Sequence, residues 1–568
     1  MLSIKRQLER DLVAGMQQLV IDGVLQAVPS NVALSYCKEV AHGDFAATVA
    51  LQVAKLEKKN PRDIALALQR VIGNANGLLS KTEIAGPGYL NLFVANAPWH
   101  GVLRNALLQG TDFLQSDCGA GEKVLLEYVS ANPTGPLHVA HGRGAVIGDV
   151  LARLMHTAGY DVHREYYIND LGNQTDVMAR SVYLRYRELL GHAFEAPEEF
   201  YPGEYVTDIA KTVLDEYGDR YENEPESIWL EPMRQRGLAL MMDRIRADLA
   251  AFNVSFDAFM SERELTDAMD LPKFVEALEA SGHIYVEDGK KWFRSTDFGD
   301  DKDRVVIRDD GRATYFAADL AYHHQKLQRG FHRLIDVWGA DHGGYVTRVR
   351  AGLVALGHAD NALDVILVQM VSLVRGGEAV RMGKRLGTAV WLRDVIDEAG
   401  ADATRYFFAM RRAESQMEFD IELATKKSID NPVYYAQMGH ARLCAIARRA
   451  ASSGYENVDL KTADLSLLTL PEEIDLIRQM DKSKDVIAEA AAAHETHLVV
   501  HYLQEMIAQF HSYYTKYKNT ERVISDNRET TIARLALCEG LRCIFAGLLE
   551  LLGVAAPTEM HLEESDKP

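Results

Sequence analysis

The hydrophobic pattern around residue 125 predicts a strand, a helix and a second strand in succession. Residues 124–129 (VLLEYV) are almost entirely apolar, which is typical of a parallel strand that is covered on both faces. Residues 145–159 (AVIGDVLARLMHTAG) have helical spacing and end in a glycine, and residues 160–168 (YDVHREYYI) alternate like a strand. This order predicts a βαβ unit and therefore a Rossmann-like, nucleotide-binding α/β sheet.

The same patterns divide the remainder of the 568-residue chain, which is too long for one core. Residues 1–115 mix helical runs with an alternating strand and predict a small α+β domain. Residues 116–425 contain the βαβ unit and predict a catalytic α/β domain, with a helical insertion at about 175–300 where acidic and aromatic residues are frequent. From 426 to 568 the spacing is helical almost throughout, which predicts an all-α bundle.

Composition narrows the possible functions. The formal net charge of -20 argues against a nucleic-acid partner, although a local basic face can outweigh it. No apolar run approaches the ~20 residues that span a bilayer, so we expect no transmembrane helix. The five cysteines include no CxxC pair, which argues against cysteine-ligated zinc and suits a reducing cytosol. The N-terminus lacks a signal-peptide core, and a cytoplasmic location is expected.

A loop rich in glycine and proline joins the first predicted strand to its helix. Residues 130–144 read SANPTGPLHVAHGRG and set His138 and His141 three positions apart. In such sheets ligands bind beyond the carboxyl ends of the strands, where the following helix directs its positive dipole end. Two imidazoles at this place can contact a phosphate that gains charge in a transition state. An HxxH pair alone, however, is more often two surface histidines.

The strings around this loop resemble the arginyl-tRNA synthetases. HVAHG is similar to the "HIGH" signature of class I aminoacyl-tRNA synthetases, and EYVSANPTGPLHVAHGRG followed by REYYINDLGNQ is similar to the arginyl family in particular. Residues 315–323, 336–349, 381–408 and 431–443 continue the resemblance in the family's order. The signature motif comprises Ala131, Asn132, Pro133, Thr134, Gly135, Pro136, Leu137, His138, Val139, Ala140 and His141.

The resemblance implies a fold of three parts and a reaction. A Rossmann-like catalytic domain with an inserted domain would follow an N-terminal additional domain that contacts tRNA, and a C-terminal helical bundle would bind the anticodon. The reaction would be that of an arginine–tRNA ligase, with ATP, L-arginine and tRNA(Arg) as partners, in a monomer. Mg²⁺ would arrive with ATP, and no zinc is expected. Accordingly, we expect no metal at His494, His497 and His501, although their spacing places them on one helical face.

The resemblance also implies which residues act on ATP. The second class I signature, "KMSKS" in the family, falls at RMGKR, where Arg381 and Gly383 depart from it and Lys384 matches its second lysine. His138, His141 and Lys384 would be catalytic. The ATP-binding residues would be Gly135, His138, His141, Gly142, Gly339, Asp341, His342, Met382, Lys384 and Arg385.

Arginine has a planar, permanently charged guanidinium, and its pocket needs carboxylates. Glu127 lies inside an otherwise apolar strand and needs a cation if it is buried; alternatively it faces water at a sheet edge. Asp319 follows Tyr315 by four residues, on the same face of a helix. By resemblance, Asn132 would bind the α-amino group, and Glu127, Tyr315 and Asp319 would hold the guanidinium and the stem.

The C-terminal bundle combines cations with tyrosines, which suits phosphates and unpaired bases. The candidate tRNA-binding residues are Lys426, Arg442, Tyr513, Tyr517 and Lys518. Some of these tyrosines are expected in the core of the bundle instead. Three other functions remain open: a class I synthetase for another amino acid, a small-molecule nucleotidyltransferase, and a catalytically inactive tRNA-binding relative, which only the Arg381 and Gly383 departures favour.

Overall fold

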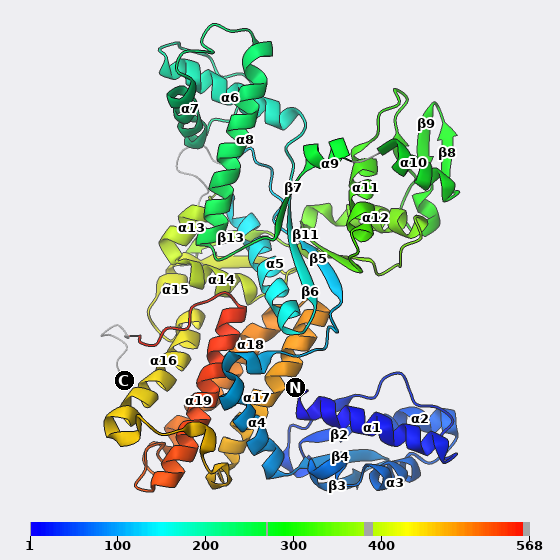
Figure 1. Ribbon diagram of the computed structural model, residues 1–568, viewed down its shortest axis with the longest axis vertical. Coiled ribbons are helices and arrows are strands. Elements are labelled where there is room, and N and C mark those ends of the chain that lie inside the picture. The colour runs from blue at the N-terminus through cyan, green and yellow to red at the C-terminus, as the bar shows by residue number, and fades with distance from the viewer. Residues whose placement is uncertain (1, 269–270, 380–389, 561–568) are drawn as a thin grey trace.

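The computed structural model describes residues 2–268, 271–379 and 390–560. It is elongated, with the α/β core at mid-height, two inserted lobes at one end, and the N-terminal domain and helical bundle at the other (Figure 1). The predicted fold class is confirmed. In the described residues no helix is both long enough and apolar enough to cross a membrane.

The core is a five-stranded parallel sheet with the order β12-β11-β5-β6-β7. Its strands are β5 (Lys123–Glu127), β6 (Asp161–Ile168), β7 (Ala258–Ser261), β11 (Arg333–Gly339) and β12 (Leu363–Val368). Helix α5 (Val139–Thr157) connects β5 to β6, as the sequence predicts. The chain leaves β5 toward β6 on one side and places β11 on the other, so β5 marks the point where strand order switches and where ligands bind.

The expected helical insertion at about 175–300 is divided into two lobes. The first holds α6 (Asn173–Leu189), α7 (Glu204–Tyr217) and α8 (Glu226–Ala251), after which β7 returns to the core sheet. The second is mixed and includes α9 (Glu262–Ala268), α10 (Leu271–Ala280), β8 (Ile284–Glu287), β9 (Lys290–Phe293) and β10 (Arg304–Ile307). It packs against α11 (Tyr315–Gln328), which precedes core strand β11, and lies beside α12 (Gly343–Ala355), which follows it (Figure 1). Strand β7 has four residues, too few for a recognisable alternation.

The N-terminal domain packs helices on an antiparallel sheet of order β1-β2-β4-β3. Asn60 caps α3 by accepting a hydrogen bond from the N–H of Arg62, and Pro61 occupies the first helical position. The elements are α1 (Ile4–Ile21), β1 (Leu34–Tyr36), β2 (Phe45–Ala47), α2 (Val49–Glu57), α3 (Pro61–Ile72), β3 (Leu79–Ala85) and β4 (Tyr89–Val94). Helix α4 (Asn96–Gln109) follows and packs against the C-terminal helices α17 (Pro471–Ala493) and α19 (Arg528–Leu551) (Figure 1).

A small sheet and the helical bundle complete the chain. Strands β13 (Val371–Arg375), β14 (Glu378–Ala379) and β15 (Met417–Asp420) accompany the helices α13 (Leu392–Ala399), α14 (Ala401–Ala409) and α15 (Ile421–Thr425). The bundle consists of α16 (Pro432–Ala450), α17 (Pro471–Ala493), α18 (His497–Tyr517) and α19 (Arg528–Leu551). Helix α17 packs against both α4 and α5, so the bundle contacts the helix that begins at the HxxH loop.

Candidate active site

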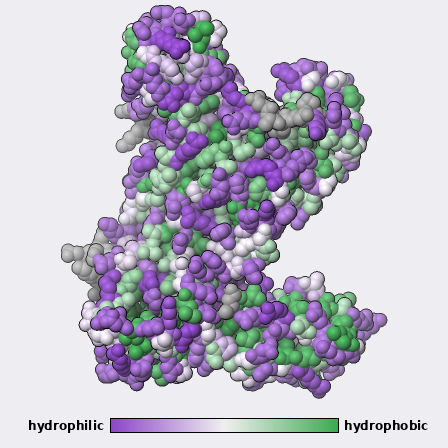
Figure 2. All heavy atoms as spheres, in the orientation of Figure 1, coloured by the Kyte–Doolittle hydropathy of each residue, from purple (hydrophilic) through white to green (hydrophobic). Residues whose placement is uncertain are grey.

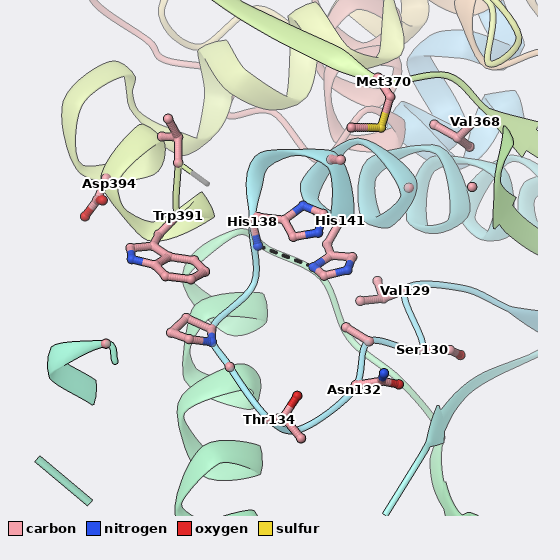
Figure 3. Close-up of a pocket in the computed structure, with 18 of the residues that line it drawn as sticks. Val129, Ser130, Asn132, Thr134, His138, His141, Val368, Met370, Trp391 and Asp394 are labelled. Carbon is pink, nitrogen blue, oxygen red and sulfur yellow. Dashed lines mark hydrogen bonds between the residues drawn. The ribbon is translucent and has the colours of Figure 1, made fainter. Parts of the chain in front are cut away.

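A cleft of about 2070 Å³ opens at the carboxyl ends of the parallel strands (Figure 3). Its walls come from the signature loop, the first turns of α5, the loop after β11, and segments 368–370 and 390–398. The signature residues that line it are Ala131, Asn132, Thr134, Gly135, Pro136, His138, Ala140 and His141. The cleft therefore lies where the strand order predicts a ligand site.

His138 and His141 stack on one another beside this cleft (Figure 3). Their ring centroids are 3.6 Å apart, with 22° between the planes. The backbone N–H of His138 donates a hydrogen bond of 3.3 Å to Nδ1 of His141. Because Nδ1 of His141 accepts this bond, the ring proton of a neutral His141 resides on Nε2.

Both imidazoles are neutral near pH 7. Burial and, secondarily, the neighbouring His138 lower the pKa of His141 to about 3, and burial lowers the pKa of His138. The pair thus offers N–H donors without full positive charge. The positive end of α5, which begins at Val139, adds partial charge at the same place.

The glycines of the loop have different tasks. Gly135 lines the cleft as expected, and Gly144, which the sequence analysis did not select, lines it as well. Gly142 is buried, and a Cβ there would lie 2.5 Å from Cδ1 of Leu392. Its small size lets α13 approach α5, so the structure places Gly142 in packing rather than among the lining residues.

The loop after β11 contributes the other expected ATP residues. Gly339, Asp341 and His342 line the cleft, and the side chains of Asp341 and His342 are exposed. The predicted residues Met382, Lys384 and Arg385, with the rest of the second signature, lie outside the described residues. Trp391, which the sequence analysis missed, lines the cleft beside His138.

Segment 390–392 is bonded to the signature loop by its backbone. The N–H of Val139 donates to the carbonyl of Val390 at 3.1 Å, and the N–H of Leu392 donates to the carbonyl of Leu137 at 2.7 Å. These bonds hold Trp391 against the loop. No local pattern could have identified Trp391, because its place in the site depends on the pairing of 390–392 with a loop more than 240 residues earlier in the sequence.

Glu127 is buried, so the alternative of a water-facing carboxylate is wrong. Its Oε1 accepts a hydrogen bond from Oγ of Ser130 at 2.9 Å, and its Oε2 accepts one from Nζ of Lys326 at 2.7 Å. Lys326 also lies 3.4 Å from Asp336. The buried carboxylate therefore has a cation from within the chain.

The expected arginine residues of α11 lie near a second acidic group. The hydroxyl of Tyr345 donates to Asp319 at 2.6 Å, and burial raises the pKa of Asp319. Burial and the nearby Asp319 raise the pKa of Glu262, and burial, Glu262 and Asp319 raise the pKa of Tyr167. The two carboxylates thus influence one another's surroundings and the same phenol, that of Tyr167.

Two further predicted residues are open to solvent. Tyr315 is 72 % exposed at the start of α11, one turn before Asp319. Asn132 lines the cleft, and its Nδ2 donates to Oε1 of Gln174 at 3.0 Å. Sequence reasoning missed Glu262, Tyr167 and Tyr345, because separate strands and helices bring them to Asp319.

The predicted tRNA residues of the bundle have different environments. Lys426 and Lys518 are exposed, and the guanidinium of Arg442 lies 6.0 Å from the ring of Tyr514. Tyr513 is only 2 % exposed and its hydroxyl donates to Glu473, so it is a core residue that cannot stack on a base. This corrects its selection, since position 513 of α18 faces the bundle. Tyr517 is half-buried and donates to Glu472 at 2.9 Å.

The histidines at 494, 497 and 501 do not gather around one point. His494 ends α17 in the left-handed conformation, and His497 pairs with Glu495 at 2.8 Å. Within the described ranges no group of three or more His, Cys, Asp or Glu side chains has the arrangement of a metal site.

Comparisons with known proteins give the same order of domains. A model of the class I tRNA synthetase (R) catalytic domain matches residues 102–446. The arginyl tRNA synthetase N-terminal domain matches residues 6–94, and the DALR anticodon binding domain matches residues 436–560. The catalytic model alone covers more than half of the chain.

Full-length relatives agree. An arginine–tRNA ligase of Syntrophotalea carbinolica is 47 % identical over 91 % of this chain and 93 % of its own, and one of Bacillus subtilis is 44 % identical over 93 % and 94 %. Thermus thermophilus arginyl-tRNA synthetase shares the fold, with a TM-score of 0.77 at 22 % identity over 98 % of this chain and 100 % of its own. The chain belongs to the arginyl-tRNA synthetases of class I.

Proposed function

We propose that this chain activates L-arginine with ATP and transfers it to the 3′-terminal adenosine of tRNA(Arg). The observation that carries the proposal is the pair of stacked, neutral imidazoles at the start of α5, on the wall of a large cleft at the strand ends. Full-length similarity to arginine–tRNA ligases supports the same reaction. ATP enters as its Mg²⁺ complex, and zinc takes no part.

In the first step the arginine carboxylate attacks the α-phosphate of ATP and pyrophosphate leaves, with no covalent enzyme intermediate. The protein positions the reactants and stabilises charge on the phosphates. His141 directs its Nε2 proton outward because Nδ1 accepts the N–H of His138. A donor of this kind contributes roughly 10²–10³ in kcat. Met382, Lys384 and Arg385 are proposed to act on the phosphates with it, on the strength of the sequence signature.

Arginine recognition is proposed to rest on carboxylates that are buried or half-buried. Asp319 accepts one hydrogen bond, from Tyr345, and has a second carboxylate, Glu262, near it. Burial and the charge of Asp319 raise the pKa of Glu262, and two such carboxylates form an attractive environment for a guanidinium. Glu127 and Tyr315 are proposed to complete this pocket, with Asn132 on the α-amino group in the cleft.

In the second step a ribose hydroxyl of the terminal adenosine attacks the adenylate. The bundle is proposed to bind the anticodon loop with Lys426, Arg442, Tyr517 and Lys518, while the N-terminal domain contacts the body of the tRNA. We propose that bound tRNA is also required for the first step. The enzyme is proposed to work as a monomer in the cytoplasm.

The decisive experiment is charging of purified tRNA(Arg) with labelled arginine, alongside pyrophosphate exchange with and without tRNA. Charging that depends on arginine, ATP and tRNA supports the proposal. Tight tRNA binding without either reaction would instead identify an inactive tRNA-binding relative. Full exchange without tRNA would overturn the requirement for tRNA in the first step.

A further inference from the structure

Arg143 is a fully buried cation two residues after His141, in the first turns of α5. Its Nη1 donates to the carbonyls of Gln369 at 2.9 Å and Ser415 at 2.8 Å. Its Nη2 donates to the carbonyl of Arg412 at 2.7 Å. One guanidinium therefore connects α5 to backbone at two distant places in the sequence.

These carbonyls belong to two loops, of which one lines the cleft and the other contacts the first. Gln369 and Met370 join β12 to β13 and line the cleft, and Figure 3 draws Met370 in the same cleft as His141. Residues 412–415 precede β15, and the N–H of Gln369 donates to the carbonyl of Ala413 at 2.9 Å. The second loop thus supports the first, and Arg143 holds both.

The chemistry of the contacts explains why the residue is an arginine. The three acceptors are neutral carbonyls, and Glu414 is the nearby carboxylate that favours the charged form. Burial nevertheless lowers the pKa of Arg143 to about 10. The side chain stays charged near pH 7, and its burial costs desolvation free energy. A planar fork reaches several fixed acceptors at once, whereas a lysine ammonium is a single point.

We propose that Arg143 is a positioning residue for adenylate formation: it fixes the Gln369–Met370 wall relative to His141 and so sets the fit of ATP in the cleft. The inference rests on the proposed function, since it concerns the ATP half of that reaction. It assigns Arg143 no contact with substrate. Displacement of the wall would disturb ATP more than arginine, because Asp319 and its neighbours lie on elements that Arg143 does not contact.

Arg405 supplies a matched control. It is also 0 % exposed, and its guanidinium donates to the carbonyls of Leu552, Phe252 and Asn253. It pairs with Asp149, away from the residues that line the cleft. Arg143→Lys and Arg405→Lys therefore make the same substitution at two buried arginines that bond to backbone carbonyls. Only Arg143 bonds to the Gln369–Met370 wall, and only Arg405 has an ion pair, with Asp149.

The test measures KM for ATP, KM for arginine and kcat in pyrophosphate exchange with tRNA(Arg) present, together with Tm. We expect Arg143→Lys to raise the ATP KM, or lower kcat at saturating ATP, by roughly 10- to 100-fold, as small misplacements near reacting groups do. The arginine KM should change less than about twofold. Arg405→Lys should lower Tm by a similar amount and leave the ATP KM near the parent value.

Several results would overturn the inference. One is unchanged kinetic constants in Arg143→Lys with a lowered Tm, because Arg143 would then be only a stabilising residue. Equal changes in the KM for ATP and the KM for arginine would also overturn it. So would equal kinetic effects in Arg143→Lys and Arg405→Lys. Absence of exchange in the parent protein would instead refute the proposed function, so the two failures are distinguishable.

Discussion

Nζ of Lys326 lies 2.7 Å from Oε2 of Glu127 in the core of the catalytic domain, although 199 residues separate them in sequence. Register alignment sets Glu127 beside Asp336 on one neighbouring strand and Glu165 on the other. Lys326 is 0 % exposed and also pairs with Asp336. A row of three acids thus crosses the sheet from β11 through β5 to β6, and the buried Lys326 pairs with two of them.

The first prediction follows from this pair. Lys326→Met would leave Glu127 and Asp336 buried without their shared cation, and removal of one partner from a buried ion pair costs about 3–5 kcal/mol. We expect a lower midpoint in denaturant unfolding of the catalytic domain.

The second measurement compares how much saturating arginine stabilises the Lys326→Met variant and the parent. If the substrate guanidinium reaches Glu127, arginine should stabilise the Lys326→Met variant more than the parent, because it supplies the lost charge. Equal stabilisation of both proteins would remove Glu127 from the arginine pocket. The loss of stability itself would be refuted by an unchanged unfolding midpoint.

This pair also marks the limit of prediction from sequence. The pattern of residues 124–168 fixes the βαβ unit, because alternation and helical spacing are local properties. Local patterns also place His138 and His141 at the start of α5. The strand alone left open whether Glu127 is buried against a cation or faces water. The identity of Lys326 as the cation depends on where α11 lies relative to β5 in the folded chain.

Other errors have the same origin. A tyrosine can stack on a base at the surface or fill the core of a helical bundle. Only the packing of α18 in the bundle shows that Tyr513 is a core residue. Gly142 was selected as an ATP-binding residue, whereas the position that a Cβ would occupy is filled by Leu392 from α13. Glu262 carries no local motif, and becomes a candidate only when β7 and α9 bring it near Asp319.

The second prediction concerns Asp319. Asp319→Asn removes a half-buried charge that we propose meets the guanidinium, and hydrogen bonds to charged groups contribute about 1.5–3 kcal/mol. We expect the arginine KM to rise by roughly 10- to 100-fold with little change in the ATP KM. Tyr345→Phe keeps the carboxylate and removes its 2.6 Å hydrogen bond, so its effect should be less than about tenfold. An arginine KM within twofold of the parent in Asp319→Asn would contradict the assignment.

The third prediction concerns His141. Its pKa of about 3 means that the ring is neutral between pH 5 and 8, so this group should contribute no inflection to kcat in that range. The folded protein binds fewer protons than the unfolded chain between pH 3 and 6.5, so the contribution of His141 to stability rises with pH across that window and is complete above it. His141→Ala should lower kcat for exchange by roughly 10²–10³ and leave the Kd for tRNA unchanged. Parent-like kcat would remove His141 from the mechanism.

The fourth prediction concerns the contact between the N-terminal domain and α17. Oδ2 of Asp481 accepts the N–H of Ile4 at 2.8 Å, and burial, with Asp485 as a further contribution, raises the pKa of Asp481 to about 7. The folded state therefore binds more protons than the unfolded chain between pH 4 and 7. Stability from this group is full at low pH and is lost as pH rises to about 7, at about 1.4 kcal/mol for each pH unit.

Asp481→Asn removes this titration and keeps an acceptor for Ile4. The variant should show a flatter dependence of Tm on pH between 5 and 8, and at pH 8 its Tm should equal or exceed that of the parent. Glu489→Gln, an exposed change on the same helix, is the control. Identical pH profiles for the Asp481 variant and the parent would contradict the assignment.

The last prediction tests the face of the bundle that tRNA uses. Lys518 is exposed at the end of α18, and Tyr513 is buried one turn earlier. If Lys518 neutralises one phosphate, Lys518→Ala should weaken tRNA(Arg) binding and reduce the slope of log K against log salt by about one. Tyr513→Phe retains the buried ring and removes only its hydrogen bond to Glu473, so the Kd and the salt slope should stay at parent values. An unchanged slope in the Lys518 variant would place the phosphate contacts elsewhere, and weakened binding in Tyr513→Phe at parent Tm would show that its hydroxyl serves the tRNA rather than the core.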